Sequence, residues 1–285
     1  MEKEKVVLED IRRQMETLPG HLGFYYKNLV TGLTYGVREE EAFLAASVIK
    51  FPLYLHILAQ AETGQLSLEE KLTVRPRDKM PSCGALNQFP GEVQADIATL
   101  CRLMIVISDN TATNEIIDVV GMERIRQFCL DHGFTNTWIW RKIFYQGCTP
   151  PPQVPEGMPY NATTAGDLGR MLEQLADGTL VDEASCRKII QIMANQRIAR
   201  LKTLLPYSGR ADPREEVLRL PEEGHVVVAS KGGTLETPPI AHDAGIFYLP
   251  DGRYYVVTIC TCSSSLEETT KIINEVGRVI YEAMK

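Results

Sequence analysis

Ser47-Val48-Ile49-Lys50 stands at the head of a nearly unbroken apolar run that continues from Phe51 to Ala61. Side chains three residues apart lie on one face of a helix, so the serine hydroxyl and the lysine amine become neighbours. A lysine buried among apolar side chains is desolvated, which lowers its pKa and leaves a neutral amine able to take the serine proton. The stretch therefore predicts an activated serine nucleophile at the start of a buried helix.

The tetrapeptide alone has a simpler interpretation, because a chain of this length contains roughly one Ser-x-x-Lys by chance. Two further motifs follow it, Ser108-Asp109-Asn110 and Lys231-Gly232-Gly233. Each also has a simpler interpretation by itself, as a turn or as a solvated strand end. Together and in this order, the three motifs resemble the Ser-x-x-Lys, Ser-Asp-Asn and Lys-Thr-Gly set of class A β-lactamases and penicillin-binding proteins.

The resemblance extends beyond the motifs, through residues 108–114 and through the strand-like stretch 242–248. It implies an α/β (α+β) fold of the β-lactamase/transpeptidase type, with an antiparallel sheet flanked by terminal helices, an inserted all-α lobe and an active site between them. We therefore expect residues 1–285 to form a single catalytic unit, in which residues 1–46 and 215–285 make the α/β lobe and residues 47–214 make the all-α lobe.

The residue pattern agrees with this order of elements. Branched and aromatic residues that predict strands occur near both ends of the chain, whereas the middle has helical periodicity. The expected strands lie in residues 22–35, 225–231, 241–248 and 253–261, and a last helix is expected at 266–284. Periodicity alone does not show that the two ends share one sheet.

Three residues receive catalytic roles from the resemblance. Ser47 is the expected nucleophile, Lys50 the base for acylation, and Ser108 the residue that passes a proton to the departing nitrogen. Acyl transfer needs such a nucleophile, a base and a proton donor, together with donors aimed at the developing oxyanion. The resemblance implies that the backbone N–H groups of Ser47 and Thr234 supply these last donors.

The same resemblance predicts the substrate-binding residues. Asn110 is expected to bind the substrate amide, and Lys231 to bind the substrate carboxylate and help keep the nearby lysine neutral. Gly233 and Thr234 complete this set. Gly232 departs from the threonine or serine that is usual at its place, so one hydroxyl that would contact the carboxylate is missing, which argues for altered specificity.

The largest departure from the family pattern concerns the residue that would catalyse hydrolysis of the acyl-enzyme. Class A enzymes carry a glutamate close behind an arginine that anchors a loop, and this glutamate activates water. Here residues 141–145 are Arg-Lys-Ile-Phe-Tyr, and Glu156 is the only acidic residue between Arg141 and Asp167. Glu156 is therefore the candidate for the missing base, with a solvated loop charge as the alternative, and Tyr145 is a weaker candidate.

The composition of the chain argues against nucleic-acid binding and against membrane spanning. The chain has 285 residues, 44% of them hydrophobic, and a formal net charge of −7. An acidic chain of this kind gives no electrostatic reason to expect nucleic acid, and its apolar runs are too short or interrupted to span a membrane. The first residues lack the apolar core of a signal peptide. We expect a monomer that acts in the cytoplasm on a small-molecule substrate, although a trimmed secreted form would look the same.

Cysteine usage fits a reducing compartment, because the seven cysteines form no Cys-x-x-Cys pair. Cys260 and Cys262 share a strand face, but no further ligands complete a zinc site. We therefore expect buried free thiols, no metal and no cofactor. The cysteines are Cys83, Cys101, Cys129, Cys148, Cys186, Cys260 and Cys262.

Three functions remain open from the sequence. The first is a class A-like β-lactamase with an unusual deacylation apparatus. The second is a cytoplasmic serine amidase, peptidase or esterase whose natural substrate is not a β-lactam. The third is a covalent binder with little turnover, like the penicillin-binding proteins. The description that these share is a β-lactamase-related serine hydrolase, which forms an acyl-enzyme.

Overall fold

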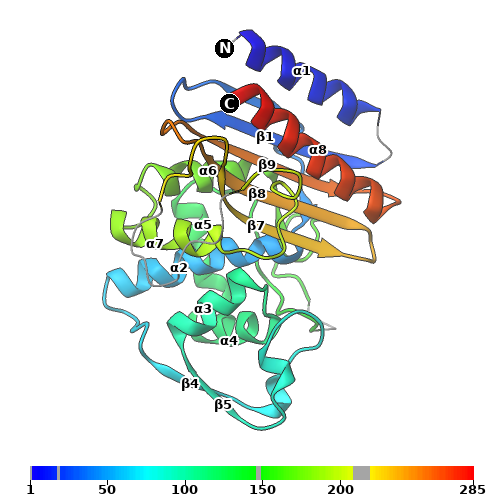
Figure 1. The fold of residues 1–285 in the computed structure, drawn as a ribbon. Helices are drawn as coiled ribbons and strands as arrows, with labels where there is room; N and C mark the ends of the chain where they lie inside the picture. Colours follow the sequence, from blue (N-terminus) through cyan, green and yellow to red (C-terminus); the bar gives the residue numbers. More distant parts are fainter. Residues whose placement is uncertain (1, 18–19, 146–148, 208–218) are drawn as a thin grey trace.

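A five-stranded antiparallel sheet joins the two ends of the chain in the computed structural model, which describes residues 2–17, 20–145, 149–207 and 219–285 (Figure 1). The strand order is β2-β1-β9-β8-β7. The strands are β1 (His21–Asn28), β2 (Thr34–Val37), β7 (Val227–Leu235), β8 (Ile240–Tyr248) and β9 (Tyr254–Cys262). In the pair formed by β1 and β9, the register runs from His21 opposite Cys262 to Asn28 opposite Tyr255. The two ends therefore share one sheet, as the resemblance implied.

Helices cover both faces of this sheet, which explains why β8 and β9 are buried along almost their whole length. The terminal helices α1 (Glu2–Glu16) and α8 (Leu266–Met284) pack together on one face, over a core that includes Leu8, Phe24 and Ile273. Helix α6 (Ala165–Ala176) covers the other face, and α7 (Glu183–Ala194) packs against β7 (Figure 1).

The remaining helices surround α2 (Lys50–Glu62), which carries the apolar run predicted from the sequence. They are α3 (Ile97–Val106), α4 (Asn110–Val120) and α5 (Met122–Asp131). Every α2 residue from Lys50 to Leu58 is buried. Burial of each large apolar side chain contributes about 1.5–3 kcal/mol, so packing against its neighbours explains why this helix forms.

The lobe between residues 47 and 214 is not entirely helical, and this corrects the expectation of an all-α lobe. Strands β4 (Lys71–Val74) and β5 (Val93–Asp96) pair with each other, and β6 (Ala162–Thr163) pairs with β3 (Phe43–Leu44). The described residues also form the 3₁₀ helices η1 (Ala46–Ile49), η2 (Pro76–Asp78) and η3 (Leu86–Gln88). The expected lobe boundary near residue 215 lies outside the described residues.

The six described cysteines are free thiols, but not all of them are buried as expected. Cys83 is exposed, Cys262 is half-buried, and Cys148 lies outside the described residues. The buried ones are Cys101, Cys129, Cys186 and Cys260. Within the described ranges, no group of three His, Cys, Asp or Glu side chains is placed to hold a metal ion. No helix in those ranges is long and apolar enough to cross a membrane.

Candidate active site

Ser47 lies in the 3₁₀ helix η1 immediately before α2, and its backbone position is fixed from several sides. The N–H of Ala45 donates to the carbonyl of Asn161 at 2.7 Å. Ala46 has a φ of 47°, which is uncommon for a residue with a side chain and marks local strain. A Cβ at Gly233 would lie 2.8 Å from the backbone nitrogen of Ser47. Glycine is therefore required there for β7 to approach the serine so closely.

The buried His242 on β8 holds the segment before the serine. Its Nδ1 accepts a hydrogen bond from the Thr261 N–H at 3.0 Å, which leaves Nε2–H to donate to the carbonyl of Leu44 at 2.9 Å. Burial lowers the pKa of His242 to about 4. This ring is therefore neutral at physiological pH and acts as a fixed structural link between β8 and β3.

Lys50 is fully buried at the start of α2. Its Nζ lies 2.7 Å from the carbonyl of Ser108, 2.8 Å from Oδ1 of Asn110 and 3.0 Å from Oγ of Ser108. Burial, and after it the positive charge of Lys231, hold the pKa of Lys50 well below its usual value. A neutral amine has two N–H donors, which suit the two carbonyl acceptors, and one lone pair that can accept a proton.

Lys231, also fully buried, approaches the same hydroxyl from β7. Its Nζ donates to the Gly232 carbonyl at 2.6 Å and to Ser108 Oγ at 3.3 Å. Burial lowers its pKa to about 7, with Asp243 opposing the shift. The Ser108 hydroxyl therefore lies between two lysine amines, on a residue with a φ of 58°. The three predicted motifs meet at this hydroxyl.

Asp109 explains why the second motif can hold this geometry. One carboxylate oxygen caps α4 by accepting from the Ala112 N–H at 3.0 Å, and the other accepts from the N–H groups of Ala85 and Leu86. The Asn110 N–H donates to the Cys83 carbonyl at 3.1 Å. The motif is therefore tied to residues 83–86, and Cys83 lies beside the site.

Arg200 is a site residue that the sequence analysis missed. A Cβ at Gly232 would lie 2.5 Å from the carbonyl oxygen of Ile198, so the segment after α7 occupies the space of the missing hydroxyl. The same segment brings the Arg200 guanidinium onto Thr234, where Nη2 donates to Oγ1. Its Nη1 is buried and has no hydrogen-bond partner among the described residues. The glycine at position 232 was the only sequence signal of this rearrangement.

Asn161 joins the two ends of the loop that follows Arg141 through hydrogen bonds. The side-chain oxygen of Asn161 accepts from the N–H groups of Trp140 and Arg141 at 3.0 Å, and its amide nitrogen donates to the Arg141 carbonyl. The Arg141 guanidinium stacks on the ring of Tyr160, 3.2 Å from its centroid. A neutral amide and a cation–π contact therefore anchor this loop.

The candidate deacylating base does not join the cluster. Glu156 lies in an exposed turn, and no hydrogen bond or ion pair among the described residues links it to Ser47 or Lys50. Tyr145 is also exposed. The backbone of Ile143 is tied to the motif helix, because its N–H donates to Asn114 Oδ1 at 2.8 Å and its carbonyl accepts from Asn114 Nδ2 at 3.0 Å.

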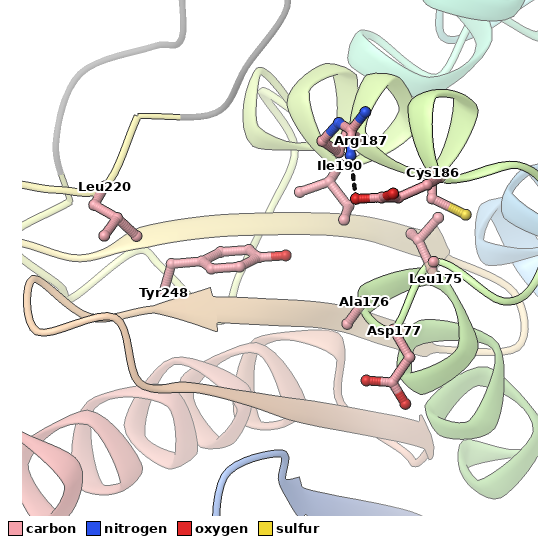
Figure 2. Close-up of a pocket in the computed structure, with 10 residues that line it drawn as sticks. Leu175, Ala176, Asp177, Cys186, Arg187, Ile190, Leu220 and Tyr248 are labelled. Atoms are coloured by element: carbon pink, nitrogen blue, oxygen red, sulfur yellow. Dashed lines mark hydrogen bonds and ion pairs between the residues drawn. The ribbon is translucent and has the colours of Figure 1, made fainter.

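A separate cavity of about 290 Å³ lies between the end of α6, the first half of α7 and the end of β8 (Figure 2). Leu175, Ile190 and Tyr248 line it. None of its lining residues belongs to the three motifs, so this cavity is distinct from the candidate active site.

Comparison with known proteins shows which family the chain belongs to. The sequence profile of the "Beta-lactamase enzyme family" matches residues 7–284. The chain belongs to this family. Family membership and the observed sheet and helices confirm the resemblance and the fold predicted from the three motifs.

Individual β-lactamase-family relatives are distant. The β-lactamase of Rhodobacter capsulatus is 34% identical over 122 residues, which span 42% of this chain and 41% of that protein. The β-lactamase structure from Sphaerobacter thermophilus has a TM-score of 0.81 at 24% identity and covers 98% of this chain and 97% of its own, which shows the shared fold. A substituted form of PBP-A, determined as an acyl-enzyme complex with penicillin G, has a TM-score of 0.80 at 27% identity, covering 98% and 96%.

Proposed function

We propose that Ser47 forms an acyl-enzyme with β-lactams or related amides and esters, and that the acyl group leaves slowly. The observation that carries this proposal is the buried Lys50 amine, held between Ser108 and Asn110 and beside the charge of Lys231. A lysine whose pKa is lowered in this way is a competent base at neutral pH.

Acylation then proceeds with all groups in this cluster. The lone pair of Lys50 takes the Ser47 proton as the serine oxygen attacks the carbonyl carbon, while the N–H groups of Ser47 and Thr234 stabilise the negative charge on the carbonyl oxygen. Cleavage of the amide bond leaves electrons on nitrogen, which receives a proton through the Ser108 hydroxyl. Lys50 returns its extra proton to Ser108, so the proton count balances.

Cations on β7 and after α7 would hold the substrate carboxylate. Lys231 is one, and Arg200 is the second, because its Nη1 has no hydrogen-bond partner in the described part of the chain. Arg200 takes the place of the hydroxyl that Gly232 lacks, since the guanidinium presents several donors in a rigid fork that suits a carboxylate. We infer a substrate that carries a carboxylate near the scissile bond.

The identity of Ile143, whose backbone is bound by Asn114, favours slow release of the acyl group. Ile143 has no basic group, and among the described residues no hydrogen bond or ion pair links Glu156 to Ser47 or Lys50. A covalent binder with little turnover, one of the functions open from the sequence, is therefore the second candidate. The two candidates share the acylation step and differ only in how fast water reaches the ester.

Intact-mass measurement after mixing with a penicillin tests the proposal. We expect the mass of the protein to rise by one penicillin, on Ser47, and to return to its starting value over minutes to hours. A panel containing simple esters serves as the comparison for the amidase and esterase alternative. Absence of any adduct with every β-lactam and ester would refute the acyl-enzyme proposal.

The pH dependence of acylation reports on Lys231. Because its pKa is lowered to about 7, Lys231 loses its positive charge as pH rises through 7, and the acylation rate constant for a carboxylate-bearing β-lactam should fall above that pH. Lys231→Arg keeps the charge, since a guanidinium stays protonated, and should remove this alkaline decrease. A neutral ester without a carboxylate is the control, and an unchanged alkaline decrease in the variant would contradict the assignment.

A further inference from the structure

We infer that Asp243 on β8 is a positioning residue for recognition of the substrate carboxylate, because it anchors the segment that carries Arg200 and places a buried negative charge near Arg200 and Lys231. The inference rests on the proposed function, since it concerns how the same site binds a carboxylate. Its evidence is the register of β7 and β8, the hydrogen bonds of the Asp243 carboxylate and the charges on which it acts.

The strand register places Asp243 beside the glycine that replaces the usual hydroxyl residue. Asp243 lies opposite Gly232 in the antiparallel pair formed by β7 and β8, so side chains at these two positions lie on the same face of the sheet. A Cβ at Gly232 would lie 2.5 Å from the Ile198 carbonyl on that face. The next residue, Gly233, faces Ser47 instead, because successive residues of a strand alternate between faces. Asp243 therefore lies next to the segment after α7, on the face of the sheet that points away from Ser47.

The Asp243 carboxylate binds this segment through two backbone groups. Its Oδ2 accepts from the N–H of Arg200 at 2.5 Å and from the N–H of Leu201 at 2.9 Å. Two hydroxyls hold the Arg200 side chain, because its Nε donates to Thr270 Oγ1 at 3.4 Å and its Nη2 donates to Thr234 Oγ1. Asp243 therefore fixes the backbone of Arg200, while Nη1, which has no hydrogen-bond partner among the described residues, remains available for a substrate carboxylate.

The second oxygen of Asp243 carries a cost that folding alone does not explain. Asp243 is fully buried, and its Oδ1 has no hydrogen-bond partner in the part of the chain that the structure describes. A buried charge without a full set of partners destabilises a fold unless opposite charges compensate it. Arg200 and Lys231 supply such charges, since the Asp243 carboxylate opposes the lowering of the pKa by burial in both. The carboxylate is therefore matched to the two cations that would bind the substrate.

Lys231 is sensitive to the charges around it because it is fully buried. Asp243 on β8, and Cys83 when it is ionised, raise the pKa of Lys231, whereas Arg200 after α7 lowers it. Lys50 on α2 is a further cation that repels it. Burial has already lowered the pKa of Lys231 to about 7. Loss of the Asp243 charge would lower this pKa further and leave the amine mostly neutral at pH 7.

Asp243→Asn separates the charge from the hydrogen bonds, because the amide oxygen still accepts from both N–H groups. We expect the alkaline decrease in the rate constant for acylation by benzylpenicillin to move about one pH unit toward acid. Acylation by a neutral ester should keep its wild-type pH profile. Asp167→Asn is the matched control, since Asp167 is an equally buried carboxylate on α6 that pairs with Arg170; its profile should not move. An unshifted profile in Asp243→Asn would overturn the role of the charge.

Asp243→Ala removes both the charge and the hydrogen-bond acceptor. We expect acylation by benzylpenicillin at pH 5, where Lys231 is charged, to be roughly tenfold slower, the size of loss expected when a hydrogen bond to a charged group is weakened. The rate with the neutral ester should not change, and retained thermal unfolding temperatures exclude misfolding. Equal losses with both substrates would show a general structural defect and contradict a role in carboxylate recognition.

Hydrogen exchange of residues 197–201 gives a readout that does not depend on acylation. Protection of the Arg200 and Leu201 N–H groups should fall in Asp243→Ala and persist in Asp243→Asn. Unchanged protection in the alanine variant would overturn the anchoring role even if penicillin acylates the wild-type protein. If no β-lactam or ester acylates the wild type, the proposed function fails, and the exchange measurement still decides whether Asp243 anchors Arg200.

Discussion

Ser47→Ala should abolish covalent acylation, with a loss of several orders of magnitude in rate, as when other acyl-enzyme nucleophiles are removed. The fold should survive, because the half-buried side chain loses only its hydroxyl oxygen and the backbone of η1 is held by β7 and by Asn161. Intact-mass measurement after incubation with benzylpenicillin gives the readout, and circular dichroism checks the fold.

Ser67→Ala is the matched control, since Ser67 is exposed in the connection between α2 and β4. This variant should acylate at the wild-type rate. Peptide mapping of the wild-type adduct must place the penicillin on Ser47. An adduct that persists in Ser47→Ala at the same rate would show that another nucleophile carries the chemistry.

The fold was predictable because its signals are local and repeated along the chain. The apolar run 51–61 predicts α2, and Asp96 and Thr164 cap α3 and α6 as their sequence positions suggest. The pairing of β1 with β9 was not predictable from periodicity. Periodicity indicates that a segment forms a strand, but it does not indicate which strand, more than two hundred residues away, is its partner. The family resemblance supplied that pairing.

The site was predictable to the extent that its chemistry lies in short motifs. Lys50, Ser108, Asn110 and Lys231 meet as the motif order implied. Arg200 was missed because an arginine after a helix is usually a solvated charge. Only the close approach of the Ile198 carbonyl to Gly232 explains why the Arg200 side chain points toward Thr234. Such a contact between backbone segments has no sequence pattern of its own.

The deacylation step shows a further limit of sequence reasoning. The sequence left Glu156 as the candidate base because it is the only acidic residue in the loop. Proximity in space depends on which loop residue lies beside Asn114 of α4, and the hydrogen bonds of Asn114 go to the backbone of Ile143. The role of Glu156 remains a prediction, and Glu156→Gln tests it by the rate of acyl release.

Ile143→Glu should convert slow release into turnover. Asn114 would still hold the backbone of residue 143, and a glutamate side chain is about as long as the helical turn that separates Asn114 from Asn110. Its carboxylate would therefore reach the space beside the acyl-enzyme and act as a general base for water. General base catalysis typically contributes 10²–10⁴-fold, so we expect the release of benzylpenicilloate to accelerate by about a hundredfold.

The charge-free variant Ile143→Gln separates base catalysis from a simple gain of polarity. It has the same shape as the glutamate but no basic oxygen, so its release rate should stay within a few-fold of wild type. Release in Ile143→Glu should also fall as pH drops through the pKa of the new carboxylate, because only the ionised form accepts a proton. Equal acceleration by glutamine and glutamate would mean that Ile143 slows release by excluding water, and that the site already contains a base able to use it.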